Sequence, residues 1–267
     1  MVVDRSTRRC LLCGTSFTGR AFVCRPCADR YRQGRIPDEV LRRFYSQVDI
    51  EYPEWANTYG NYNPPRALMN WLDRVDRSAR ILEIGAGGGF LLEELGERGF
   101  ADLTGSDITV TALAEMSQRA HIFRVVAADA ESLPFASGSF DVVISSDVIE
   151  HVTRPYQHLA EVQRILAQGG LYLIKTPNRR PAELYYRARD LYDHHIWHPS
   201  MFTPGELSSA LAATGFSAEY LSVSDLTAAQ LRKIPTRPAR ALAEKFPISR
   251  LPVSLHPHLE VVATRLP

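Results

Sequence analysis

Three side chains that can bind a metal or move a proton follow one apolar run of the sequence. Asp147, Glu150 and His151 lie in "SSDVIEHV" (145–152), directly after the apolar residues 142–144. Two carboxylates and an imidazole at one strand end suit Mg²⁺, which lowers the pKa of a bound hydroxyl. In the other interpretation Glu150 is a helix-start acid and His151 packs against a bound ligand. The pattern predicts an active-site rim and leaves the metal open.

All four cysteines fall within eighteen residues near the N-terminus. Cys10 and Cys13 form one C-x2-C pair, and Cys24 and Cys27 form a second pair after ten intervening residues. This is the spacing of a four-thiolate zinc site. Disulfides or free thiols are the alternatives, and disulfides would require an oxidising compartment. Residues 1–33 therefore resemble a zinc ribbon with a structural zinc.

The charge distribution and the placement of the cysteines limit the reactions that the protein can catalyse. The net charge is +1, but residues 1–43 hold ten arginines and only four acidic residues. A basic N-terminal segment is able to contact phosphate or RNA. Because all cysteines are used in the ribbon, none is left as a nucleophile, which excludes methylation of cytosine C5 through a covalent adduct.

The elements that position these residues alternate between strand and helix. Apolar runs predict strands at 79–85, 101–108, 122–129, 140–147, 169–177, 217–224 and 258–265, with helices at 89–99, 109–119, 155–167 and 204–214. Such alternation predicts an α/β fold, a Rossmann-like three-layer sandwich around a mostly parallel seven-stranded sheet. We divide the chain into the ribbon (1–33), a helical linker (34–62) and a main domain (63–267).

Three strand ends carry a ligand-binding pattern. The first is followed by "GAGGG" (85–89), which lacks both the third glycine of a dinucleotide fingerprint and the Gly-Lys-Ser/Thr of a phosphate loop. Asp107 ends the second strand, where an acid accepts ribose hydroxyls. Asp129 ends the third, where a carboxylate accepts from an adenine amino group. The pattern favours a nucleoside-like cofactor.

These motifs resemble the class I S-adenosylmethionine-dependent methyltransferases, in particular their small-molecule branch. The similarity rests on "ILEIGAGGGFLLEEL", "GSDIT", "AADAESLPFASGSFDVVISSDVIEHV" and "RILAQGGLYLIKTPN" and covers residues 80–215. It implies that Glu83, Gly85 and Gly87 line the methionine end, Asp107 holds the ribose, and Asp129 with Ala130 holds adenine. The predicted cofactor set is completed by Ala86, Ile108 and Ser145.

The same resemblance bears on the acceptor. Asp147, Glu150 and His151 are similar to the Glu-x-x-Glu-His metal site of ubiquinone-pathway O-methyltransferases, with Asp in place of the first Glu. The Asp/Asn-Pro-Pro-aromatic turn of enzymes that methylate exocyclic amines of bases is absent. An insert at 179–203 is expected to cover the acceptor pocket, and it holds several Tyr and His residues. We predict His151, His195 or His198 as general base.

The sequence therefore predicts an O-methyltransferase for a sugar, phenol or other small molecule. An RNA methyltransferase whose ribbon grips nucleic acid is the main alternative; N- or C-methylation and a non-catalytic binder come after it. The ribbon would be a structural cap over the acceptor site or a contact in a homodimer. No apolar run reaches the ~20 residues of a membrane span, and no signal peptide is visible. We expect a cytoplasmic protein without a membrane partner.

Overall fold

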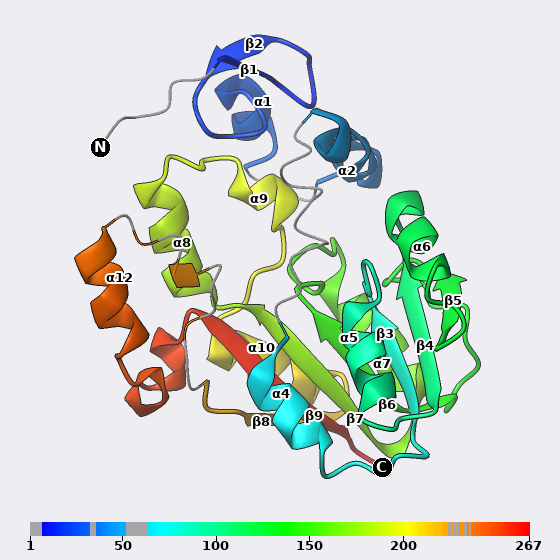
Figure 1. Ribbon diagram of the computed structural model, residues 1–267. Coiled ribbons are helices and arrows are strands. Elements are labelled where there is room, and N and C mark those ends of the chain that lie inside the picture. The colour runs from blue at the N-terminus through cyan, green and yellow to red at the C-terminus, as the bar shows by residue number, and fades with distance from the viewer. Residues whose placement is uncertain are drawn as a thin grey trace.

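The computed structural model describes residues 7–32, 36–51, 64–223 and 236–267, together with 226, 230, 231 and 234. Its centre is a seven-stranded sheet of order β5-β4-β3-β6-β7-β9-β8 (Figure 1). β9 pairs antiparallel with both β7 and β8, and all other strand pairs are parallel. The strands are β3 Arg80–Ile84, β4 Asp102–Asp107, β5 Arg124–Ala127, β6 Phe140–Ser146, β7 Leu166–Pro177, β8 Phe216–Tyr220 and β9 His258–Arg265. The predicted mostly parallel seven-stranded sheet is confirmed.

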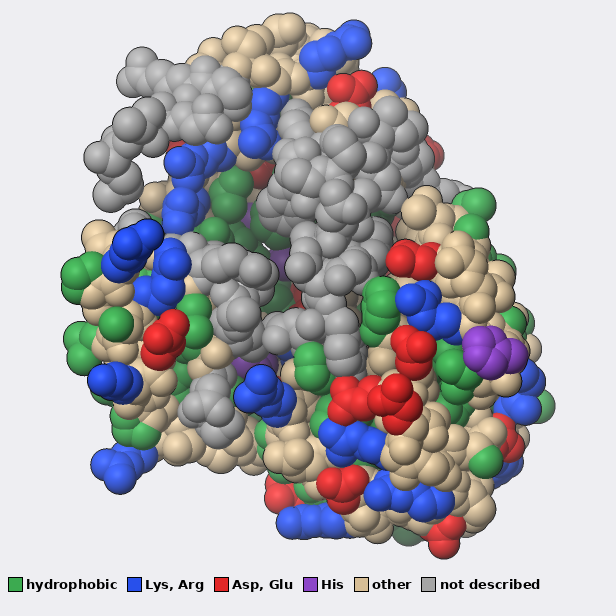
Figure 2. Space-filling view, viewed as in Figure 1, with side chains coloured by type: hydrophobic (Ala, Val, Ile, Leu, Met, Phe, Trp, Pro, Cys, Tyr) green, Lys and Arg blue, Asp and Glu red, His purple; other side chains and the backbone are tan. Residues whose placement is uncertain are grey.

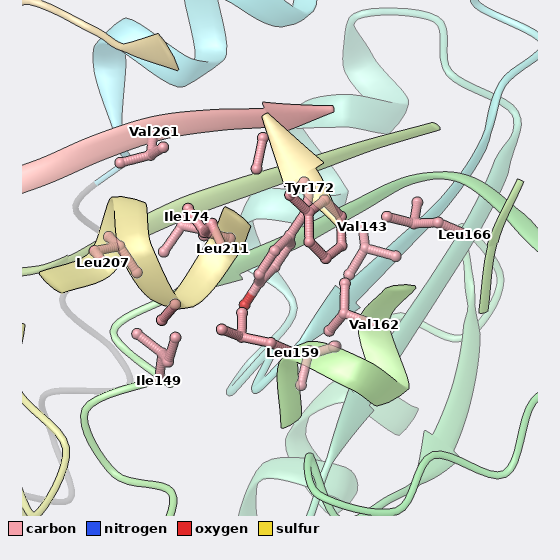
Figure 3. Close-up of a cluster of buried hydrophobic side chains, with 14 of the residues drawn as sticks. Val143, Ile149, Leu159, Val162, Leu166, Tyr172, Ile174, Leu207, Leu211 and Val261 are labelled. Atoms are coloured by element: carbon pink, nitrogen blue, oxygen red, sulfur yellow. The ribbon is translucent and has the colours of Figure 1, made fainter. Parts of the chain in front are cut away.

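Helices cover both faces of this sheet. Alternate residues of a strand point to opposite faces, so each strand supplies apolar side chains to two cores. Leu82, Val143 and Ile174 pack with α7 and α10, as Figure 3 shows for part of this core. Ile81 and Val142 pack with α4, α5 and α6 on the other face. These helices are α4 Arg66–Leu72, α5 Phe90–Glu97, α6 Val110–Ser117, α7 Pro155–Ile165 and α10 Pro204–Ala213.

A third core joins the N-terminal segment to the predicted acceptor-side insert. The N-terminal hairpin and helices are β1 Thr7–Arg9, β2 Ser16–Thr18, α1 Arg25–Arg30 and α2 Asp38–Glu51, and the insert forms α8 Arg179–Ala188 and α9 His194–Trp197. Phe22 and Phe44 are buried together with Tyr186, Ile196 and Trp197. Figure 1 accordingly places β1, β2 and α1 over α9, with α2 beside it. The ribbon and the insert thus fold as one apolar unit.

The remaining described elements lead into the last strand. They are α12 Arg237–Glu244, η1 Ile248–Arg250 and η2 Val253–Leu255. The predicted boundary between ribbon and linker, and that between linker and main domain, lie outside the described residues. Among the described helices, none has the length and apolar character needed to cross a bilayer.

Candidate functional site

The glycine loop after β3 meets the end of β4. Gly85 and Gly87 have φ values of 67° and 53°, a region that glycine adopts without a steric penalty. A Cβ on Gly85 would lie 2.5 Å from Val148 Cγ2, so the loop is in close contact with the stretch that follows β6. The N–H of Gly87 donates to Asp107 Oδ2 at 3.1 Å, and Ala86 N–H donates to the Ser106 carbonyl. The structure therefore brings this loop and Asp107 together.

Glu83 lies buried in β3, just before the loop. Its Oε2 has no hydrogen-bond partner among the described residues. Burial raises the pKa of Glu83 well above its usual range, and the negative charge of Asp107 adds to the shift. A buried carboxylate oxygen is costly unless a donor or cation satisfies it. The α-ammonium group of S-adenosylmethionine is such a cation, so the residues present fit this cofactor.

The predicted adenine side is open to solvent. Asp129 is exposed, and its Oδ1 accepts from the N–H of Glu131 at 2.8 Å. Ala130 is half-buried, while the side chain of Ile108 is 61% exposed just after Asp107. An exposed apolar side chain beside a carboxylate fits a flat, partly polar ring, with the apolar surface against the ring face and the carboxylate toward an amino group.

The side chain of Ser145 does not face this open side. It is fully buried, and its Oγ lies 2.7 Å from the Tyr172 hydroxyl, which lies 2.8 Å from His158 Nε2. Because β6 alternates, Ser145 shares the face of Val143 in the core. The predicted side-chain contact of Ser145 with the cofactor is therefore not supported.

The stretch after β6 departs from the predicted metal triad. Asp147 has a φ of 57° and pairs with Lys175, whose Nζ lies 2.5 Å from Asp147 Oδ2. The group that comes together is instead Glu150, His151 and His198, whose ligand atoms all lie within 4.8 Å of one another. Asp147 of the predicted set is therefore paired with the buried Lys175, and the imidazole of His198, from the insert, lies with Glu150 and His151 instead.

Glu150 is fully buried between these groups. Its Oε2 accepts from Thr176 Oγ1 at 2.9 Å, and its Oε1 has no partner among the described residues. Burial, with the charge of Asp147 as a smaller cause, raises the pKa of Glu150 to about 8. The carboxyl group is consequently protonated at neutral pH.

The contacts of His151 determine which of its two ring nitrogens carries the hydrogen. Nδ1 lies 2.7 Å from the Trp197 carbonyl and 2.7 Å from the Tyr45 hydroxyl. A carbonyl oxygen can only accept, so Nδ1 carries the hydrogen and donates to it. Burial lowers the pKa of His151, which favours the neutral ring. Nε2 is then left with its lone pair, as a general base requires.

The other two predicted histidines have separate places. His198 lies beside His151, with ring centroids 4.6 Å apart, and its Nδ1 is 3.0 Å from the Tyr186 hydroxyl. His195 turns away from this pair, and its Nε2 donates to the carbonyl of Ala28 in α1 at 2.9 Å. The structure therefore brings His151 and His198 together and places His195 against the ribbon.

The four cysteines come together as their spacing predicts. The sulfur atoms of Cys10, Cys13, Cys24 and Cys27 all lie within 4.8 Å of one another, and none forms a disulfide. Hydrogen bonds with Thr15 lower the pKa of the Cys13 thiol to about 6, whereas burial raises the pKa of the Cys24 and Cys27 thiols. A thiolate is the form that binds zinc, so the donor set fits a structural zinc ion.

Three residues of this region had no clear signal in the sequence. Tyr45 lies on α2, in the predicted linker, and reaches His151. Lys175 is buried near the end of β7, and its role as the partner of Asp147 is seen only in the structure. Asp193 stands among the aromatic residues of the insert and binds backbone N–H groups of the ribbon.

Known proteins resemble the part of the chain that builds this site. The family described as "Methyltransferase domain" matches residues 82–174. A ubiquinone biosynthesis O-methyltransferase of Psychrobacter arcticus is 31% identical over 205 residues, which cover 62% of this chain and 78% of that protein. The same-named protein of Cereibacter sphaeroides is 35% identical over 152 residues, 48% of this chain, and the match spans only 60% of that relative.

Solved structures agree on the fold. A chain from a complex of the Haloferax volcanii Trm112 methyltransferase activator with a methyltransferase superposes with a TM-score of 0.61 at 18% identity, over 82% of this chain and 98% of that chain. At this identity the similarity supports the fold alone. Taken with the sequence matches, it shows that the chain belongs to the class I S-adenosylmethionine-dependent methyltransferases.

Proposed function

We propose that this protein transfers a methyl group from S-adenosylmethionine to a hydroxyl of a small ring-shaped molecule, a phenol, a sugar or a related intermediate. The observation that carries the proposal is the cluster of Glu150, His151 and His198 directly after β6. The contact between Gly85 and Val148 ties this segment to the glycine loop. The relatives with O-methyltransferase names point to the same reaction.

The cofactor would be held by residues of three strand ends. Glu83 would meet its ammonium group, Asp107 its ribose hydroxyls, and Asp129 with Ala130 its adenine. Bound S-adenosylmethionine supplies an activated methyl group on a sulfonium. The protein's part is then mainly to align the acceptor oxygen and to remove its proton.

His151 would remove that proton. Its Nδ1–H is held by the Trp197 carbonyl, so Nε2 carries the lone pair that would accept the proton. The acceptor hydroxyl loses its proton to Nε2, and the oxygen–methyl bond forms as the sulfur–methyl bond breaks. Protonated Glu150 would lie beside this ring as a neutral hydrogen-bonding group. His198 and Tyr186 would line the acceptor side.

A metal-assisted reaction is the second candidate for the same site. One carboxylate and two imidazoles suit zinc, manganese or iron better than magnesium, which prefers oxygen ligands. Asp147, the oxygen donor that would favour magnesium, is paired with Lys175. We therefore favour proton removal without magnesium and expect turnover to persist in EDTA. Loss of turnover in EDTA and its return on addition of Mg²⁺ would instead support the magnesium site.

RNA methylation is the alternative for the acceptor class. Exposed arginines of the ribbon, such as Arg9, Arg25 and Arg30, favour it. On the face shown in Figure 2, Lys and Arg side chains gather on the left side, while at the lower right they are interspersed with acidic ones. The relatives with O-methyltransferase names favour a small-molecule acceptor, so we rank RNA methylation second.

The chemical position of the transferred methyl tests the proposal. The protein is incubated with ¹³C-methyl S-adenosylmethionine and the small-molecule fraction of a cell extract, and the labelled products are examined by NMR. O-methyl signals are the expected result. Signals of N-methyl or C-methyl groups alone would contradict it.

A further inference from the structure

A buried carboxylate is one of the links between the ribbon and the predicted general base. Asp193, at the start of α9, is 0% exposed. Its Oδ2 accepts from the backbone N–H of Phe22 at 2.7 Å and from that of Val23 at 3.0 Å. These two N–H groups directly precede Cys24, one of the four cysteines. Asp193 therefore binds the backbone at the edge of the zinc knuckle.

The segment that follows Asp193 forms one wall of the acceptor site. α9 starts at the next residue and ends at Trp197, whose carbonyl receives the Nδ1–H of His151. His198, the following residue, lies against the His151 ring. Only four residues lie between Asp193, which is bound by the ribbon, and His198, whose imidazole lies beside the predicted base.

Further contacts hold α9 against the ribbon from the same side. His195 donates to the Ala28 carbonyl, and the ring of Trp197 packs edge-on against Phe22 at 6.1 Å between centroids. A helix of four residues has little stability of its own, so these contacts and Asp193 determine its position. Any shift of α9 would move the Trp197 carbonyl away from His151.

We propose that Asp193 is a positioning residue through which the four-cysteine ribbon fixes the orientation of His151 and His198. The inference rests on the proposed role of His151 as the base. The ribbon is then a part of the acceptor site, and an intact ribbon is required for a correctly oriented imidazole. The ribbon would act by holding these imidazoles in place, and this role does not require contact between the ribbon and the methyl acceptor.

The test compares three variants of the full-length zinc-loaded protein. Asp193→Ala removes both hydrogen bonds from the N–H groups of Phe22 and Val23. Asp193→Asn keeps a carbonyl oxygen that can accept from these two N–H groups. Asp190→Asn is the matched control, since it removes the charge of the mostly exposed Arg25–Asp190 pair, three residues away, and Asn tolerates the φ of 53° at this position. Zinc content, affinity for S-adenosylhomocysteine and the ¹⁵N imidazole signals of His151 are measured for each.

Asp193→Ala should change His151 from one tautomer, with hydrogen on Nδ1, to a mixture, while the affinity for S-adenosylhomocysteine stays within about twofold. Asp193→Asn should restore the wild-type signals, and Asp190→Asn should leave them in place. Wild-type His151 signals in Asp193→Ala would overturn the proposal, whether or not zinc is released faster. If Asp193→Ala fails to fold, Asp193→Asn with Cys24→Ser carries the test: zinc loss in Cys24→Ser must then shift His151, and unchanged signals would overturn the proposal.

This readout is independent of methyl transfer. The tautomer reports the position of α9 even if the acceptor is RNA or a metal serves the chemistry. Failure of the proposed function would appear in the identity of the labelled product, and failure of this inference would appear in the His151 signals.

Discussion

Replacement of Glu150 by Gln should abolish the contribution of this side chain to the pH dependence of stability. Glu150 is buried, and its pKa is raised from 4.5 to about 8. Between these pH values the native protein holds a proton that the unfolded chain has released. The free energy of unfolding therefore falls as the pH rises through this window, and the loss is complete above about pH 8. Gln mimics the protonated carboxyl and does not titrate.

The size of the effect follows from the same shift. One pKa unit corresponds to about 1.4 kcal/mol, so the wild-type protein loses on the order of 5 kcal/mol over the full window, and about 2 kcal/mol of this by pH 6. Glu150→Gln should match the wild type near pH 4.5, because its amide oxygen can still accept from Thr176. Above pH 8 it should be more stable by several kcal/mol, which is about 10 °C or more in Tm.

Thermal unfolding at pH 5 to 9 in EDTA measures the difference. Subtraction of the two curves removes the titration of all other groups, which both proteins share. Glu97→Gln is the control, because it removes an exposed carboxylate of α5 and should leave the pH dependence unchanged. A difference between wild type and Glu150→Gln that is constant with pH would refute the assignment of a protonated Glu150.

Three other substitutions test the remaining parts of the site. Asp107→Ala should weaken S-adenosylhomocysteine binding about 10–100-fold by calorimetry, since hydrogen bonds to a charged group contribute about 1.5–3 kcal/mol each; unchanged affinity would contradict the ribose assignment. Cys24→Ser should reduce bound zinc measured by mass spectrometry, and equal zinc in both proteins would rule out the four-cysteine site. Gly85→Ala should lower Tm more than Gly138→Ala, because both glycines have positive φ but only at Gly85 would a Cβ meet another side chain, Val148. Equal losses would show that this contact is easily relieved.

The sheet was predictable because its determinants are local. Each strand is a short apolar run, and runs such as 79–85 and 140–147 need no knowledge of their neighbours to be recognised. The parallel arrangement then brings the strand ends to one edge, which explains why Asp107 lies beside the glycine loop after β3. The four cysteines were predictable for the same reason, since their spacing lies within one short segment.

Side-chain partners across the chain were not predictable in this way. His195 meets Ala28, 167 residues away, and Asp193 meets Phe22, 171 residues away. Nothing in the insert distinguishes a histidine that faces the acceptor from one that faces the ribbon. Asp147 matches a metal-site pattern in sequence, but the buried Lys175 of the next strand needs a counter-ion and takes it.

The proposed acceptor is a small molecule. The most direct measurement is incubation of the protein with methyl-labelled S-adenosylmethionine, below saturation, and cell extract, followed by separation into RNA and small-molecule fractions, with the weakly binding Asp107→Ala as the control. We predict label in the small-molecule fraction that is much reduced in the control. Label confined to RNA would contradict it and would make the ribbon a nucleic-acid-binding module.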